Sequence, residues 1–164
     1  MKNILADFVK YFLKKYPYKQ ELSASRLTKM MYLADWKSAI DDSSLLTNVK
    51  WHFNHYGPYV DDFIESVSDD PDVLLESVNN FYGSKKTLIS MKNYEWQDHL
   101  TTRQKEIFDF VIEATKDKTY SDFIKLVYST YPVVTGSRYV DLDLLKFARD
   151  YRELKKIPMG KLNQ

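Results

Sequence analysis

Hydrophobic side chains in the first forty residues recur every three or four positions, which is the spacing of one face of an α-helix. This spacing predicts one helix over residues 3–15, ended by Pro17, and a second over about residues 25–40, with Ser23 or Ser25 as its N-cap. The apolar side of the second helix is formed by Leu27, Met30, Met31 and Ala34.

Near residue 50 the pattern changes to an alternation of apolar and polar positions. The apolar members are Val49, Trp51 and Phe53. A period of two predicts a short strand. The next residues, Tyr56, Gly57 and Pro58, are expected to be a structural motif, a corner that turns the strand into a helix. Glycine permits unusual backbone angles, and Pro58 suits the first turn of a helix that would run to about residue 67.

The rest of the chain alternates between helical spacing and clusters of turn residues. The predicted elements are a hairpin at 78–91 with its turn at 82–85, a helix at 103–116 with Thr101 or Thr102 as N-cap, a helix at 121–130, a loop or short extended piece at 133–140, and a helix at 141–155.

These elements predict a fold that is mainly α with a minor β component (α+β): a single compact helical domain with a short strand and a small hairpin. A chain of 164 residues is long enough to bury a core as one domain. Residues 1–164 are therefore expected to form one domain, with its core at about 5–155 and a polar C-terminal tail at 156–164.

The amino-acid composition argues against several classes of function. With 24 basic and 23 acidic residues the net charge is +1, which gives no general electrostatic reason to bind nucleic acid. The absence of cysteine excludes disulfides, thiolate catalysis and cysteine zinc sites. The apolar stretches are too short to span a bilayer, and Asp7 and Lys10 interrupt the first one, so we expect neither a membrane span nor a secretory signal. The cytoplasm is the expected location.

Residues able to do catalysis or bind a metal are few. Two of the three histidines, His52 and His55, would point to opposite faces of an extended segment, so no metal site is expected. The four glycines, at 57, 83, 136 and 160, are too scattered for a phosphate-cradling loop, and no cofactor is expected. We therefore expect a protein that is not an enzyme. Two alternatives stay open: a hydrolase or nuclease that pairs His52 or His55 with Asp35 or Asp61, and a DNA-binding autoregulator with a helix-turn-helix.

Aromatic residues and charges are distributed unevenly. The chain holds 13 tyrosines, a surplus that suits a protein–protein interface as well as a core. Residues 61–76 carry seven carboxylates and no lysine or arginine, and residues 146–164 carry six cations against two anions. Each stretch would be a solvated face or a docking patch for an oppositely charged partner.

One row of side chains has the composition of an interface hot spot, with tyrosine and tryptophan flanked by lysines. It lies on the second predicted helix, on a side other than the apolar one, and the corner after the strand extends it if that corner folds back beside the helix. The predicted partner-binding residues are Lys29, Tyr32, Trp36, Lys37, Trp51, His55 and Tyr59.

Two segments resemble a known family: RLTKMMYLADW at residues 26–36 and HYGPYVDDF at residues 55–63. They are similar to the Panacea domain of SocA-like antitoxins, which occurs in bacterial toxin–antitoxin pairs and in phage. Members carry a Lys-Leu-hydrophobic-Tyr helix, here residues 29–32, followed by an aromatic-rich approach to a Gly-Pro pair, here residues 56–59. The resemblance covers about residues 5–155.

The resemblance implies a protein that neutralises a cognate protein toxin by binding it directly. Toxins paired with this family include small alarmone-synthetase-like enzymes. Some relatives instead deliver a toxin to a protease. An alternative function is therefore that of a phage or mobile-element adaptor that binds a host protein or brings a toxin to a protease.

Overall fold

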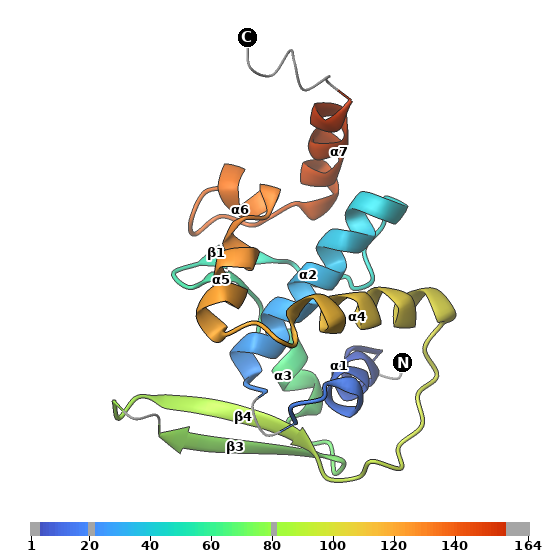
Figure 1. Cartoon of the computed structure of the whole chain (residues 1–164), viewed down its shortest axis with the longest axis vertical. Helices are drawn as coiled ribbons and strands as arrows, with labels where there is room; N and C mark the ends of the chain where they lie inside the picture. The colour runs from blue at the N-terminus through green and yellow to red at the C-terminus, as the bar shows by residue number, and fades with distance from the viewer. Residues whose placement is uncertain (1–3, 20–21, 80–81, 157–164) are drawn as a thin grey trace.

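The computed structural model describes residues 4–19, 22–79 and 82–156. These residues form seven helices and two antiparallel hairpins (Figure 1), which confirms the expected class, mainly α with a minor β component. The elements are α1 (Ile4–Lys15), α2 (Ala24–Asp42), β1 (His52–Asn54), β2 (Gly57–Tyr59), α3 (Asp62–Val67), β3 (Val73–Asn79), β4 (Lys85–Met91), α4 (Thr102–Thr115), α5 (Tyr120–Tyr128), α6 (Tyr131–Thr135) and α7 (Leu144–Lys155).

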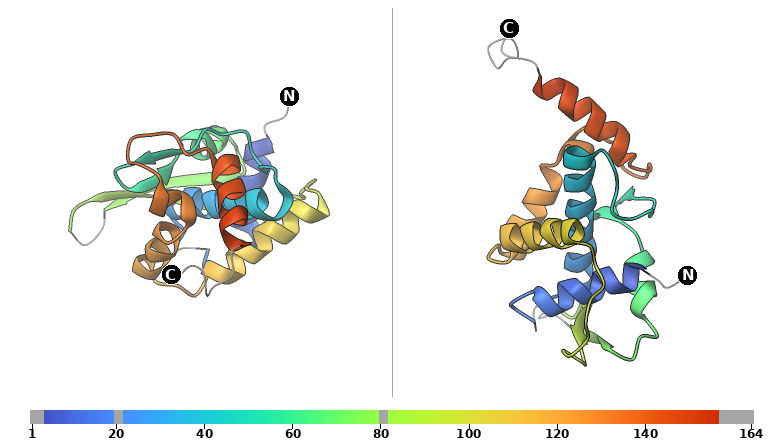
Figure 2. Two further views of the ribbon diagram at one scale, coloured as in Figure 1. Left: turned by 90° about the horizontal axis from the view of Figure 1, so that it is seen from above. Right: turned by 90° about the vertical axis from the view of Figure 1, so that its right-hand side faces the viewer.

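Helix α2 runs through the middle of the molecule (Figure 2). It begins at the N-cap Ser23, whose hydroxyl accepts a hydrogen bond from the backbone N–H of Arg26 at 3.1 Å. It contacts α3, α4, α5, α7, β2 and β4, and 12 of its 19 residues are buried. A helix enclosed on most sides has few positions left for solvent, so its burial exceeds the single apolar stripe predicted from spacing.

The far end of α2 is held by the last helix. The Nη1 atom of Arg152 in α7 donates hydrogen bonds to the carbonyl oxygens of Ala39 and Ile40, at 2.8 and 3.0 Å. The last carbonyl groups of a helix have no partner within the helix, and a cation also suits its negative end. Arg152 therefore supplies hydrogen-bond donors for carbonyl groups that have no partner within α2.

Helix α1 buries its apolar face on α4. The rings of Phe8 and Phe12 both lie against that of Phe108, and their centroids are 5.0 and 4.9 Å from the Phe108 centroid. On its other side, Lys10 forms an ion pair with Asp70 at 2.7 Å and lies 3.4 Å from Asp72. Part of the acidic stretch 61–76 is thus neutralised within the domain and does not form one free face.

The segment around Gly57 and Pro58 is a β-hairpin, so the prediction of a strand-to-helix turn is wrong. Asn54 pairs with Gly57, which leaves His55 and Tyr56 as a two-residue turn, and the Asn54 side chain accepts from the backbone N–H of Tyr56 at 2.9 Å. Pro58 lies in β2 opposite Phe53 and opens no helix, because α3 begins only at Asp62. Asparagine at the first turn position and glycine at the fourth favour such a hairpin.

Gly57 itself is structurally constrained. Its φ is +105°, a region that side chains other than glycine rarely adopt. A Cβ atom at this position would lie 2.7 Å from Cε1 of Tyr128 in α5. The motif therefore fixes how closely the β1–β2 hairpin packs on α5.

The second hairpin is longer than predicted. Its first strand starts at Val73, where residue 78 was expected, and pairs with β4 from Val73–Met91 to Asn79–Lys85. A hydrogen bond from the N–H of Ile89 to the carbonyl of Leu22, at 3.0 Å, ties β4 to the segment that enters α2. Residue 85 begins β4 and so lies outside the turn predicted at 82–85.

The last third of the chain contains one helix that was not predicted. Thr101 caps α4 in a capping box with Gln104, in agreement with the sequence. The segment expected to be a loop or extended, residues 133–140, begins within α6. Pro132 sits in the first turn of this helix, where its missing N–H costs nothing. Helix α7 starts at Leu144 with Asp143 as N-cap, three residues later than expected. Within the described residues, none of the helices combines the length and the hydrophobicity that crossing a membrane requires.

Candidate partner-docking site

The predicted partner-binding residues are divided between the interior and the surface. Lys29, Tyr32, Trp36 and Trp51 are buried, with 2, 0, 7 and 1 % of their surfaces exposed. Lys37 and Tyr59 are half-buried and His55 is exposed. The expected row along α2 is therefore not a solvent-facing surface, because neighbouring elements cover the side of α2 that was expected to be open.

Two of the buried aromatics belong to a polar network in the core. The rings of Tyr32 and Trp51 meet edge to face at 5.6 Å, and the Tyr32 hydroxyl lies 2.8 Å from Oγ1 of Thr130. The indole N–H of Trp51 donates to Oδ2 of Asp35 at 2.9 Å. Buried tyrosine and tryptophan need such partners for their polar atoms, so these residues serve the fold.

Asp35 is the centre of that network. Its carboxylate also accepts from the backbone N–H groups of Leu46 and Thr47, at 2.9 and 3.1 Å, and from the Thr47 hydroxyl. Burial raises the pKa of Asp35, and these donors act in the opposite direction. The carboxylate holds the segment after α2 against the helix.

Lys29 has no carboxylate partner among the described residues. Its Nζ lies 3.3 Å from the hydroxyl of Ser25, one helical turn earlier on α2. Burial lowers the pKa of Lys29 to about 8. A lysine in this position cannot reach a partner in the described conformation.

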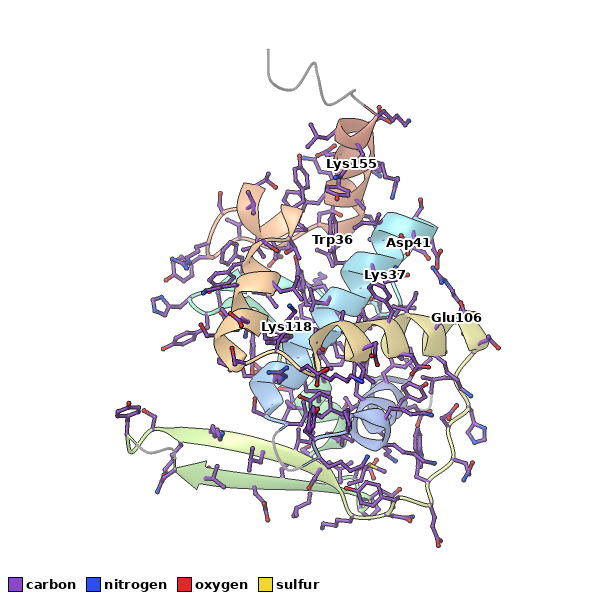
Figure 3. The ribbon with its side chains drawn as sticks, in the orientation of Figure 1. Trp36, Lys37, Asp41, Glu106, Lys118 and Lys155 are labelled. Carbon is purple, nitrogen blue, oxygen red and sulfur yellow. The ribbon has the colours of Figure 1, made fainter. Side chains whose placement is uncertain are left out.

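Trp36 and Lys37 line a groove between α2, α4 and α5, and Figure 3 shows Lys37 on α2 beside α4. The volume of this groove is about 360 Å³. It is lined by Leu33, Trp36, Lys37, Ile40, Asp41, Phe110, Val111, Ala114, Thr115, Leu126 and Thr130. Most of these side chains are apolar, and we call this feature the α2–α4–α5 groove.

Phe110 is the main exposed side chain of the groove and was not predicted. It lies on α4 with 55 % of its surface exposed, and the Lys37 ammonium sits 4.0 Å from the centroid of its ring. A cation placed over an aromatic face is attracted to it, so the two residues orient one another. The sequence does carry a signal for Phe110. It is a large aromatic residue that lies between the core positions 108 and 111 but outside the apolar stripe of the helix.

Ion pairs within the domain surround one end of the groove. Lys37 pairs with Asp41 at 2.8 Å, and Arg103 pairs with Asp42 at 2.8 Å and with Glu106 at 3.2 Å. The guanidinium of Arg103 holds the pKa of Asp42 below its usual range. An apolar centre with a polar, charge-balanced rim is the usual anatomy of a protein–protein interface.

His55 belongs to a second exposed surface at the tip of the β1–β2 hairpin. Its ring meets that of Tyr56 edge to face at 4.8 Å, and its Nδ1 lies 3.5 Å from the hydroxyl of Tyr139. Backbone hydrogen bonds from Tyr139 to Phe53 and from Phe53 to Val140 fix this loop beside β1. We call the exposed residues His55, Tyr56, Tyr139 and Val140 the hairpin-tip patch.

Tyr59 lies apart from both surfaces. Its hydroxyl donates to Asp61 at 2.7 Å, and burial together with this carboxylate raises the pKa of Tyr59 to about 12. Since Trp36 and Lys37 lie at the groove and His55 at the hairpin tip, the predicted residues do not form one surface.

The arrangement of acids and histidines offers no assembled catalytic pair of the kind considered from sequence. His52 Nδ1 lies 3.0 Å from Asp141, whereas Asp35 is engaged in the core and Asp61 with Tyr59. Across residues 4–19, 22–79 and 82–156, no group of three or more His, Cys, Asp or Glu side chains is placed to hold a metal ion.

Residues 27–132 match the family model described as "Antitoxin SocA-like, Panacea domain". The match extends over more than half of the chain, from α2 into α6, and includes every residue that lines the α2–α4–α5 groove. It also includes the turn residues His55 and Tyr56, but not Tyr139 or Val140. No curated protein and no solved structure matches the chain.

Proposed function

We propose that this chain, which belongs to the SocA-like antitoxin family defined by the Panacea domain, neutralises a cognate protein toxin by binding it directly. The α2–α4–α5 groove is the proposed contact surface. On this proposal the protein is not an enzyme, requires no cofactor and acts in the cytoplasm. A small alarmone-synthetase-like enzyme is one class of toxin to test.

The exposure of Phe110 in the groove that the buried Trp36 also lines is the observation that supports the proposed surface. A few aromatic residues at the centre of an interface commonly provide most of the binding energy. Phe110 leaves 55 % of its surface in water, and its burial by a partner would be favourable. The groove floor is already packed, so little reorganisation of the domain would oppose binding.

Charge around the groove indicates what kind of toxin segment fits. The cations Lys37 and Arg103 are paired with carboxylates of the same domain. Docking an unbalanced charge there would break these pairs or leave the new charge unpaired, which is costly. We therefore expect the toxin to insert an apolar or aromatic side chain, with polar groups only at the margin.

The hairpin-tip patch supports a second candidate function, that of a phage or mobile-element adaptor. Tyr56 and Tyr139 expose 73 and 65 % of their surfaces, on a patch whose residues are distinct from those of the groove. A protein with two separate apolar surfaces has the means to hold a toxin on one and a host protein or protease on the other. Direct neutralisation requires only one of them.

Co-expression with the protein encoded by the neighbouring gene tests both functions. Phe110→Ser should abolish growth rescue and toxin capture, while Ile4→Ser, an exposed apolar control on α1, should leave both unchanged. If Phe110→Ser rescues growth fully while its thermal melt matches that of the parent, the groove is not the contact surface.

The adaptor function is distinguished by the fate of the toxin. Tyr56→Ser would then preserve toxin capture but stop the toxin level from falling in growing cells. If the toxin level is the same with parent and variant, and growth is rescued by both, the adaptor function is rejected.

A further inference from the structure

A second recess, separate from the α2–α4–α5 groove, lies where β4, the start of α2 and the α4–α5 junction meet. Its volume is about 710 Å³, and Figure 3 marks its position by Lys118, near the start of α5. It is lined by Tyr16, Ser23, Ala24, Ser25, Arg26, Tyr59, Lys85, Lys86, Thr87, Lys116, Lys118, Thr119 and Tyr120. We call it the basic recess.

Positive charge is concentrated in this recess. Five of its lining residues are lysine or arginine and none is a carboxylate, although the whole chain carries a net charge of only +1. Lys116 is paired with Glu113 at 3.0 Å. No ion pair involves Lys85, Lys86 or Lys118 in the part of the chain that the structure describes. Mutual repulsion of these cations would be relieved by an anion between them.

The positive ends of two helices add to this field. The first turn of α2 and the N-cap Thr119 of α5 both line the recess. The hydroxyls of Ser25 and Tyr120 lie 3.0 Å apart and join the two helix starts. Helix N-termini favour bound anions, and hydroxyl groups there are further donors.

Two buried cations lie at this recess, Arg26 in its wall and Lys29 behind Ser25. Arg26 is 6 % exposed, and its Nε has no hydrogen-bond partner among the described residues, while its Nη2 donates to the carbonyl of Thr115 at 2.6 Å. Lys29 approaches the recess only through Ser25, at 3.3 Å. Buried cations that lack carboxylate partners are expensive, and an anion held nearby would lower that cost.

From this arrangement we propose that the basic recess binds a small molecule that carries two or more phosphate groups. One phosphate would leave most of the recess and most of its cations unused, whereas a polyphosphate chain can contact both β4 and the α4–α5 junction. Phosphate groups are strong acceptors for lysine, arginine and hydroxyl donors. The aromatic rings of Tyr59 and Tyr120 in the wall suit a planar ring attached to that chain. This proposal does not depend on the antitoxin function.

Titration of the purified full chain tests the proposal, with inorganic tripolyphosphate and ATP as probes at physiological salt. The test variant is Lys85→Glu/Lys118→Glu, and the control is Lys92→Glu/Lys146→Glu, which makes the same charge change at exposed lysines that do not line the recess. We expect saturable 1:1 binding to parent and control, and a loss of affinity of about tenfold or more in the test variant. Tighter binding of ATP than of tripolyphosphate would assign a role to the tyrosines.

Three results would overturn the proposal. The first is the absence of saturable binding by either probe to the parent. The second is an equal loss in the control variant, which would mean that only the net charge matters. The third is a short single-stranded RNA that binds through the same lysines more tightly than either probe, because the occupant would then be a nucleic acid.

Discussion

The ring of Tyr128 occupies the space that a side chain at residue 57 would need. A Cβ atom on Gly57 would lie 2.7 Å from Cε1 of Tyr128, closer than carbon atoms pack, and the φ of +105° already disfavours any other residue. The glycine is thus required twice, once by its own backbone and once by α5.

Gly57→Ala should lower the free energy of unfolding by about 1–3 kcal/mol, as measured by urea denaturation. The matched control is Gly83→Ala, where φ is +81° but no atom lies within 4 Å of the new Cβ. This control carries the backbone cost alone, about 1 kcal/mol. Equal losses in the two variants would show that the Tyr128 contact contributes nothing.

Lys29→Met should stabilise the protein at neutral pH by about 1–3 kcal/mol, because the native state then no longer buries the ammonium group of Lys29. The pKa of Lys29 is about 8 when folded and near 10.5 when unfolded, so the unfolded chain binds more protons between these values. The free energy of unfolding of the parent therefore gains a contribution that rises with pH across this window.

Chemical denaturation of parent and Lys29→Met at pH 7 and pH 10 measures that difference. The stability gap between them should shrink as the pH rises. Lys92→Met, at an exposed position, should keep a constant gap. A gap for Lys29→Met that is the same at both pH values would contradict the burial of an ammonium group.

Asp35→Ala should destabilise the fold by about 3–5 kcal/mol, because it leaves buried donors of Leu46, Thr47 and Trp51 without an acceptor. Asp61→Ala, which removes an exposed acceptor of Tyr59, should cost less than about 1 kcal/mol. Thermal melts compare the two. A parent-like melt for Asp35→Ala would contradict a structural role and would favour the alternative in which Asp35 is a catalytic residue.

Removal of metal ions should leave folding and toxin binding unchanged. The chain has few histidines and no cysteine, and the residues that the structure describes form no cluster of metal ligands. The measurement is a melt before and after exhaustive dialysis against a chelator, with metal analysis of the dialysed protein. Stoichiometric metal that survives dialysis, with an early melt once it is stripped, would refute this prediction.

Most helices could be predicted from short sequence patterns, because the residues that start and end a helix lie within or next to it. The capping residues Ser23 and Thr101 and the breaker Pro17 act within one turn of their own helix. The β1–β2 hairpin was missed although its signal is equally local. Gly57 and Pro58 were interpreted as a helix entry and Asn54 as part of the strand, whereas the turn chemistry of Asn54 and Gly57 decides the structure.

The candidate site could be predicted only in part, because burial depends on what packs from outside the helix. Lys29 and Tyr32 were expected to face a partner, and they are enclosed by elements distant in sequence. Trp36 and Lys37 do reach the groove, but its most exposed aromatic, Phe110, comes from α4. A periodicity within one helix cannot show which distant helix will cover it.

The hydrogen bonds from Arg152 to Ala39 and Ile40 join residues 113 and 112 positions apart. A ribosome adds about 5–20 residues per second, so a newly made α2 waits on the order of 5–20 s for the residue that completes its far end. Ile40 also lines the groove, so this surface is complete only after α7 has been made. If the groove binds the toxin, neutralisation begins only after this interval, counted from the synthesis of α2. A toxin translated at the same time is free to act during the interval.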